Sequence, residues 1–191
     1  EKPKFPLDKT HQEEFLVETD SVDYEMEEIQ ELASSLASGE DDQYVVVHKM
    51  AKWVHENIEY SLDTTTTKAS QKASWVLVNR RGVCDEITNL FIALCRSVGV
   101  PARFVSGISY TTDSRFSDRW TSHGWAEVYF PEHGWVPFDV TYGEFGYLSP
   151  AHIKLKVADD ANKSSTRYQW QARTSTISTG KLDMDTRIIE T

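Results

Sequence analysis

The sequence predicts an α+β fold in which N-terminal helices pack against an antiparallel β-sheet. Apolar residues recur at helical spacing through the first hundred residues, and short strand-like segments separated by turn residues follow. Helices followed by a run of strands are typical of α+β domains. A chain of 191 residues is long enough to bury a substantial core in one domain.

The helical half of the chain divides into four expected helices. The first is an acidic amphipathic helix within 21–38, and the second has a continuous apolar face over 47–58. A short third helix is expected at about 69–78. The fourth begins at Cys84 and ends before Gly99, because a glycine with a following proline terminates a helix.

Four strands are expected in the second half of the chain, and the middle two form a hairpin. The expected bounds are 102–110, 123–130, 135–142 and 153–157. The hairpin turn is Pro131-Glu132-His133-Gly134. A further candidate strand contains Tyr168 and Trp170.

Charge and hydropathy argue against several classes of partner. The chain carries 20 Lys and Arg against 30 Asp and Glu, which gives a net charge of −10. Nucleic-acid binding needs a basic surface, and anionic membranes attract basic segments. No apolar run approaches the roughly 20 residues of a membrane-spanning helix. We therefore expect neither a nucleic-acid partner nor direct membrane insertion of this segment.

The start of the chain indicates a piece of a longer protein, because it begins with Glu1 rather than Met. An acidic segment rich in Ser and Thr is compatible with an extracytoplasmic domain of a secreted or membrane-anchored protein, which is the location we expect. The sequence does not indicate an oligomeric state.

The two cysteines are expected to be free thiols with different roles. On one helix, eleven residues separate Cys84 and Cys95 by about 16 Å, whereas a disulfide needs Cα atoms within about 7 Å. Cys95 lies on the apolar face and is expected in the core. Cys84 lies at the helix start, where free N–H groups favour a thiolate. Asp85 and Glu86 oppose that thiolate, so a cationic neighbour is required.

Among the six histidines, His123 is the best candidate for that neighbour, because it follows a long polar loop and opens a predicted strand. The next strand carries Asp139 among aromatic residues, where a carboxylate needs a partner. If Trp125 pairs opposite Asp139, then His123 and Asp139 are diagonal neighbours on one face, with backbones about 7–8 Å apart. A slip of one residue would put them on opposite faces. The sequence leaves this register open.

Four motifs in this order resemble the transglutaminase-like superfamily, a group of papain-related thiol enzymes. They are Arg81-Gly82-Val83-Cys84-Asp85-Glu86, Val98-Gly99-Val100-Pro101-Ala102-Arg103, His123-Gly124-Trp125-Ala126-Glu127-Val128 and Gly134-Trp135-Val136-Pro137-Phe138-Asp139. The resemblance covers about residues 45–157 and implies a papain-like fold in a stand-alone, microbial-type domain. It also implies Cys84 as nucleophile, His123 as base and acid, and Asp139 as the residue that orients His123.

With this resemblance, we divide the chain into three parts. Residues 1–40 form an N-terminal extension with the acidic helix, and 41–157 form the catalytic core. Residues 158–191 are expected to add strands or an extension to the same domain.

The chemistry that the resemblance implies is acyl transfer on peptide or protein amides through a Cys–His–Asp triad. We expect hydrolysis rather than Gln–Lys transamidation, because water is always present whereas an amine acceptor needs its own site. No cofactor or metal is expected.

The supporting residues of this site are less specific in the sequence. The backbone N–H of Cys84 would supply one oxyanion donor, and Gln71 or Trp75 the second. Trp120 and Trp125 flank His123 and are candidate walls of the substrate groove, although Trp125 fits a core position better than a substrate platform. Arg103 fits a structural ion pair better than a substrate clamp.

Two other functions compete with the thiol enzyme. A non-catalytic domain of the same fold would bind a protein or peptide in the former groove, but the intact set of Cys84, His123 and Asp139 argues against it. A metal-dependent hydrolase would use His123, His133 and Asp139, which lack the tight ligand spacing of zinc motifs.

Overall fold

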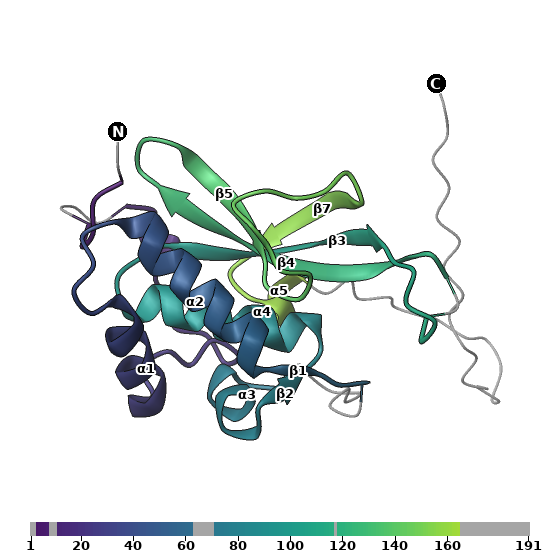
Figure 1. Cartoon of the computed structure of the whole chain (residues 1–191), viewed down its shortest axis with the longest axis horizontal. Helices are drawn as coiled ribbons and strands as arrows, with labels where there is room; N and C mark the ends of the chain where they lie inside the picture. Colours follow the sequence, from purple (N-terminus) through teal and green to yellow (C-terminus); the bar gives the residue numbers. More distant parts are fainter. Residues whose placement is uncertain (1–2, 8–10, 63–70, 117, 165–191) are drawn as a thin grey trace, which may run out of the picture.

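The computed structural model describes residues 3–7, 11–62, 71–116 and 118–164, in which helices pack on one side of an antiparallel sheet (Figure 1). The helices are α1 (Glu27–Ala37), α2 (Gln43–Asn57), α3 (Ala73–Asn79), α4 (Cys84–Ser97) and α5 (Ala161–Ser164), with a 3-10 turn at Glu13–Phe15. The strands are β1 (Glu59–Tyr60), β2 (Arg81–Gly82), β3 (Ala102–Tyr110), β4 (Trp120–Phe130), β5 (Gly134–Asp139), β6 (Glu144–Phe145) and β7 (His152–Ala158). The α+β prediction is confirmed.

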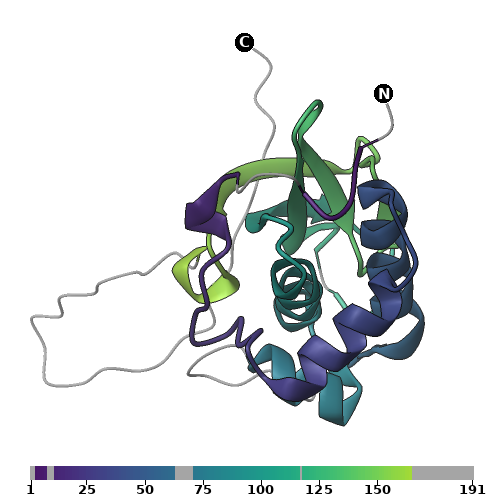
Figure 2. The ribbon, with the colours of Figure 1, turned by 90° about the vertical axis from the view of Figure 1, so that its left-hand side faces the viewer.

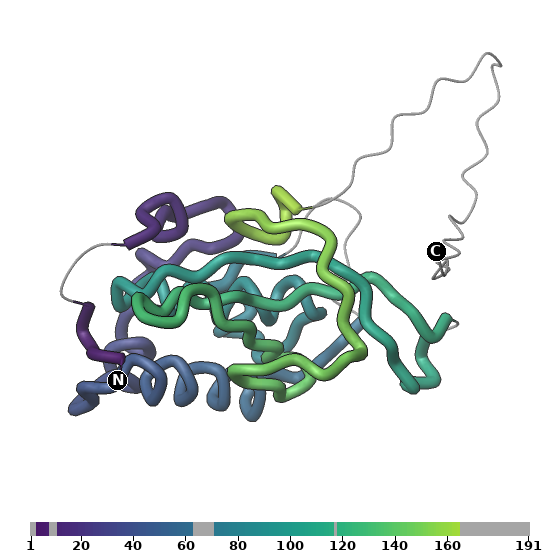
Figure 3. Tube along the Cα trace, turned by 90° about the horizontal axis from the view of Figure 1, so that it is seen from above, coloured from purple at the N-terminus to yellow at the C-terminus, as the bar shows by residue number. Residues whose placement is uncertain are grey.

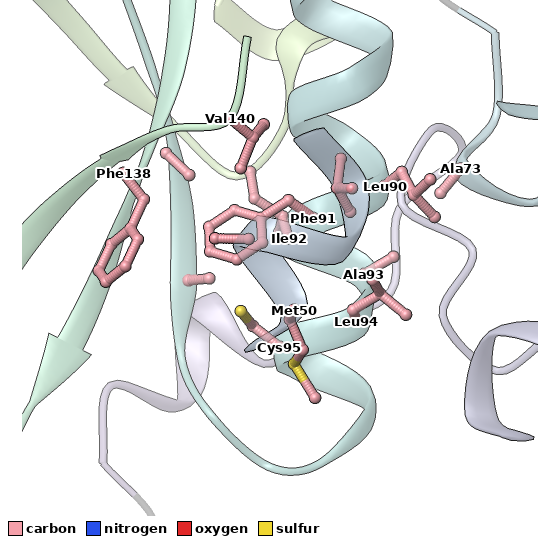
Figure 4. Close-up of a cluster of buried hydrophobic side chains, with 14 of the residues drawn as sticks. Met50, Ala73, Leu90, Phe91, Ile92, Ala93, Leu94, Cys95, Phe138 and Val140 are labelled. Carbon is pink, nitrogen blue, oxygen red and sulfur yellow. The ribbon is translucent and has the colours of Figure 1, made fainter. Parts of the chain in front are cut away.

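Helix α4 is the centre of the core. Figure 2 looks nearly along its axis and shows α1, α2, α3 and the sheet around it. Every residue of α4 from Glu86 to Arg96 is buried. Phe91 points toward Phe138 of β5, with ring centroids 5.7 Å apart, and Cys95 lies fully buried nearby (Figure 4). Cys95 is therefore a core residue, as predicted.

The main sheet has five strands in the order β6-β5-β4-β3-β7. Figure 3 shows β3 and β4 side by side along their length, and they pair from Ala102↔Val128 to Tyr110↔Trp120. The β4–β5 ladder ends at Ala126↔Phe138, so the next residues along, Trp125 and Asp139, are opposite each other. This is the register that the diagonal pairing of His123 and Asp139 requires.

Two helices begin at residues other than those predicted. The first was expected from residue 21, but α1 begins only at Glu27. In the segment before it, the Asp23 carboxylate accepts hydrogen bonds from the backbone N–H and the hydroxyl of Ser74 at the start of α3. Helix α2 begins earlier than predicted, at Gln43, because the Asp42 carboxylate caps its first turn.

The strand predicted at 135–142 stops at Asp139. Its carboxylate Oδ1 accepts the backbone N–H groups of Thr141 and Tyr142, at 2.9 and 3.0 Å, and so bends the chain into a turn. The candidate strand at Tyr168 and Trp170 lies outside the described residues. Within the described ranges, no helix combines the length and apolar character that crossing a membrane requires.

Candidate active site

Cys84 is the first residue of α4, and the buried carboxylate of Glu86 holds this helix start in place. Glu86 Oε2 accepts the Val83 N–H and Oε1 accepts the Gln71 N–H, each at 3.0 Å. One carboxylate thus ties three points of the chain together: the segment before α3, the residue before Cys84 and the first turn of α4. This explains why an acidic residue occupies a buried position in that turn.

The start of α4 packs directly on β4 at the residue that follows His123. The Thr88 hydroxyl donates to the carbonyl of Gly124 at 3.3 Å. A Cβ atom on Gly124 would lie 2.3 Å from Cζ of Phe104 and 2.9 Å from Oδ1 of Asp85. Glycine is therefore required here, because any side chain would push the helix carrying Cys84 away from the strand carrying His123.

Cys84 is a half-buried residue. The groups around its thiol shift the thiol pKa in opposite directions. Sγ lies 3.5 Å from Oδ1 of Asp85. Burial raises the pKa of Cys84 well above its ordinary value, and the charges of Asp85 and Asp139 act in the same direction, whereas the backbone of Gly124 lowers it through a hydrogen bond. The resting form at neutral pH is therefore the thiol.

The His123 ring is fixed from two sides. Its Nε2 lies 2.6 Å from Oδ2 of Asp139, and Tyr142 stacks on its face with ring centroids 4.5 Å apart at 13°. The Tyr142 hydroxyl is hydrogen bonded to Ser109 at 2.9 Å, which holds the stacking ring. With Nε2 engaged, Nδ1 is the ring atom left for acid–base chemistry.

A second histidine, His152 at the start of β7, also contacts Asp139. Its Nε2 lies 3.0 Å from the same Oδ2 atom. Burial alone would raise the pKa of Asp139, but the hydrogen bonds from His123 and His152 lower it to about 2. Asp139 is therefore a carboxylate at any pH where the protein would work.

These three side chains also form the one group within the described residues that offers metal-ligand atoms close together. The ligand atoms of His123, Asp139 and His152 lie within 4.8 Å of one another. Contacts of 2.6 and 3.0 Å are hydrogen-bond distances, shorter than the roughly 3.3 Å between two ligands of a tetrahedral zinc ion. The geometry fits hydrogen bonding better than metal coordination.

The alternative metal set with His133 is wrong. His133 lies exposed in the turn after β4, while His123 lies near the start of that strand. Seven extended residues from 123 to 130 span about 23 Å, so the two rings are at opposite ends of the hairpin.

A cleft of about 340 Å³ opens beside His123 and Tyr142. Its other walls come from the segment 111–116, from Thr121 and Ser122, and from Tyr60. Asp113 and Arg115 in this wall form an exposed ion pair at 2.6 Å. The cleft therefore opens onto the His123 ring.

The candidate oxyanion donors and the candidate groove residue Trp120 have different surroundings. Gln71 is tied to the start of α4 through Glu86, which keeps it a candidate oxyanion donor. Trp75 packs on the core, with the Arg81 guanidinium 5.9 Å from its ring, and no contact links it to Cys84 among the described residues. Trp120 stacks edge-on against Tyr110.

The assignment of Trp125 to the groove is wrong. Trp125 is 1% exposed and is absent from the described lining of the cleft. Its ring fills the space that Gly107 leaves open and meets the ring of His152 edge-on at 5.3 Å. Trp125 therefore packs against the histidine rings from the core side. Arg103 forms the expected structural ion pair, with Glu127 at 2.7 Å.

Sequence reasoning missed two residues that contact the triad. Tyr142 follows Asp139 by three residues, but its stacking depends on the turn that Asp139 itself makes. His152 is separated from Asp139 by a loop, and only its place at the start of a predicted strand distinguished it from a surface histidine.

A helix that begins at a cysteine and packs on a sheet carrying a paired histidine and aspartate is the arrangement of papain-related thiol enzymes. The family model of the transglutaminase-like superfamily matches residues 30–140. The chain belongs to this superfamily, and its mixed helices and antiparallel sheet are the family's fold.

Two curated relatives match part of the chain. It is 26% identical over 148 residues to the uncharacterized protein YebA of Bacillus subtilis, covering 71% of this chain and 20% of YebA. It is 27% identical over 105 residues to a protein-glutamine gamma-glutamyltransferase of Pseudomonas aeruginosa, covering 52% of this chain and 16% of that protein. The chain spans a fifth or less of these relatives' lengths.

Solved structures show the same fold. A candidate cysteine protease from Cytophaga hutchinsonii superposes with a TM-score of 0.70 at 24% identity, covering 86% of this chain and 53% of the other. Calcium-bound LapG of Legionella pneumophila superposes with a TM-score of 0.53 at 16% identity, covering 77% and 81%.

Proposed function

We propose that this protein is a cysteine-dependent acyl-transfer enzyme that hydrolyses peptide or protein amides through Cys84, His123 and Asp139. The observation that carries the proposal is the 2.6 Å hydrogen bond between His123 and Asp139, on a strand that packs against the helix turn bearing Cys84. A buried histidine–carboxylate pair on a strand that packs against a helix beginning with a cysteine fits nucleophilic catalysis by that cysteine.

The first step is attack by a thiol that loses its proton during the reaction. Because burial and Asp85 raise the pKa of Cys84, His123 Nδ1 takes the proton as Sγ bonds to the amide carbon. Asp139 stabilises the imidazolium that forms and keeps the ring oriented, without taking the proton itself. His123 then returns the proton to the leaving amine, which leaves a thioester on Cys84.

The oxyanion of the tetrahedral intermediate needs preorganised donors. The backbone N–H of Cys84 is one of the first N–H groups of α4, which have no partner within the helix. Gln71 supplies the second donor in this proposal, because Glu86 holds its backbone at the start of the same helix. Water then attacks the thioester, releasing the acid and the thiol.

The described lining of the cleft favours water over an amine as the second substrate. An amine acceptor such as lysine is a cation, which an acidic side chain would recognise. Asp113 is the acidic residue in that described lining, and Arg115 already pairs with it. Transamidation is the second candidate, and the name of the Pseudomonas relative, a protein-glutamine gamma-glutamyltransferase, favours it.

A peptide-library digest with and without a small primary amine tests both candidates. We expect cleavage by the wild type and by a His133→Ala control, and none by Cys84→Ala. Adding the amine should leave the products mainly hydrolysed. Cleavage that persists in Cys84→Ala would overturn the proposal, and amine incorporation as the main product would establish transamidation instead.

A further inference from the structure

The second histidine on Asp139 has acceptors at both of its ring nitrogens. Nε2 lies 3.0 Å from Oδ2 of Asp139. Nδ1 lies 3.3 Å from the carbonyl oxygen of Ser149, 3.4 Å from the Ser149 hydroxyl and 3.8 Å from Oε2 of Glu144. The hydroxyl can donate or accept, whereas the carbonyl and the carboxylates only accept. The contacts with Asp139 and with the Ser149 carbonyl are therefore both hydrogen bonds only when both nitrogens of His152 carry protons.

The surroundings of His152 favour that charged form. Its side chain is 2% exposed, and the carboxylates that face it come from two elements, Asp139 on β5 and Glu144 on β6. The other titratable rings packed against it are His123 on β4 and Tyr142, with centroids 5.8 and 5.7 Å away. Burial lowers the pKa of His152, but the hydrogen bond and charge of Asp139 outweigh this and raise it overall.

We propose that His152 is a positioning residue whose buried imidazolium anchors Asp139 and offsets part of its negative charge. Asp139 then holds His123 from a fixed position, because Thr141 and Tyr142 bind one of its oxygens and the two histidines share the other. This role rests on the proposed function of the triad.

The anchoring has a consequence for the nucleophile. The charge of Asp139 acts against the Cys84 thiolate and raises the pKa of the thiol. A cation on the far side of Asp139 reduces this opposition while leaving the hydrogen bond to His123 in place. With His152 charged, the Asp139 carboxylate orients His123 while opposing formation of the Cys84 thiolate less strongly.

The protonation of His152 is measured directly on the wild-type protein by long-range ¹⁵N–¹H NMR of the histidine rings. We expect two protonated ring nitrogens on His152 at pH 7, where an unperturbed histidine is mostly neutral, assigned by comparison with His152→Gln. A spectrum with one protonated nitrogen on His152 at that pH would overturn the proposal. This measurement needs no substrate and no folded variant beyond the one used for assignment.

The effect on the site is measured by the pH profile of Cys84 alkylation. His152→Gln keeps an N–H donor for Asp139 but has no charge, so the profile should move to higher pH by about one unit. The matched control, His133→Gln in the exposed hairpin turn, should leave the profile in place. An unchanged profile in a His152→Gln protein with wild-type circular dichroism would show a structural role only and overturn the proposal.

These outcomes are separate from those that test the proposed function. An inactive wild type with a doubly protonated His152 and a shifted alkylation profile contradicts the enzyme but keeps the anchoring role. An active wild type with a neutral His152 supports the enzyme but contradicts the anchoring role.

Discussion

Asp85 follows Cys84, the proposed nucleophile, and it opposes the charged form of that thiol. Its Oδ1 accepts from the Cys84 thiol, and burial raises the pKa of Asp85 itself, while the thiol hydrogen bond and His123 lower it. The carboxylate therefore keeps the resting sulfur protonated, and it also interacts with the imidazolium that forms at His123 in the proposed mechanism.

Replacing Asp85 with Asn should make Cys84 more reactive toward alkylation. The change removes a negative charge beside Sγ while keeping the side-chain shape, so the pKa of the thiol should fall by about one unit. The rate of iodoacetamide modification at pH 7 is the measurement. Glu132→Gln, which removes the same charge in the exposed hairpin turn, is the control. A rate equal to that of the wild type would show that Asp85 does not set the charge state of Cys84.

The residues that sequence alone could identify are those whose position follows from local pattern. Cys84 starts a helix with a clear hydrophobic period, and His123 and Asp139 lie in segments with clear strand character, although the predicted strand 135–142 ends at Asp139. The contact of Trp125 with His152 was not predictable, because it depends on the pairing of β7 with β3. Likewise, Asp23 caps α3 across 51 residues of chain, and no local pattern reports such a contact.

At the level of elements, the site depends on two layers meeting at one point. Cys84 belongs to the helical layer, whereas His123 and Asp139 belong to the sheet. The contact at Gly124 sets the distance between the layers, and the Glu86 carboxylate sets the position of the helix start. Substitutions at Gly124 or Glu86 should therefore affect the chemistry, although neither residue carries a reacting atom.

Glu86→Gln tests the second of these contacts. The amide would keep one acceptor oxygen but turn its NH₂ group toward a backbone N–H, so one buried donor would lose its partner. We expect a loss of about 1–3 kcal/mol in the free energy of unfolding. Urea unfolding measures this loss, with Glu132→Gln as a control for the change of residue type. An unfolding free energy within about 0.5 kcal/mol of the wild type would contradict the assigned role.

At the scale of the whole molecule, the Asp139 carboxylate contributes to stability in addition to its proposed part in the chemistry. The pKa of Asp139 falls from 3.8 to about 2 on folding, so the folded state binds this proton less readily than the unfolded state. The contribution is present above pH 4 and is lost as the pH falls toward 2. A shift of this size corresponds to about 2 kcal/mol.

The stability of the wild type should therefore fall between pH 4 and 2, and His152 adds a second dependence. The pKa of His152 is raised above 6.5, so its contribution is complete below pH 6.5 and is lost as the pH rises through the raised value. Urea unfolding from pH 2 to 9 measures both limbs. Asp139→Asn should weaken both, since it removes one titrating group and the partner of the other. Identical profiles for the two proteins would contradict this account.

The central claim, that Cys84 is a nucleophile served by His123, is tested most directly by limited iodoacetamide labelling followed by mass mapping. The account predicts that Cys84 is labelled well before the buried Cys95. It also predicts that His123→Ala slows labelling of Cys84 by about tenfold or more, while His133→Ala does not; general-base effects are typically about 10²–10⁴-fold. Labelling of Cys95 first, or an unchanged rate in a folded His123→Ala protein, would contradict it.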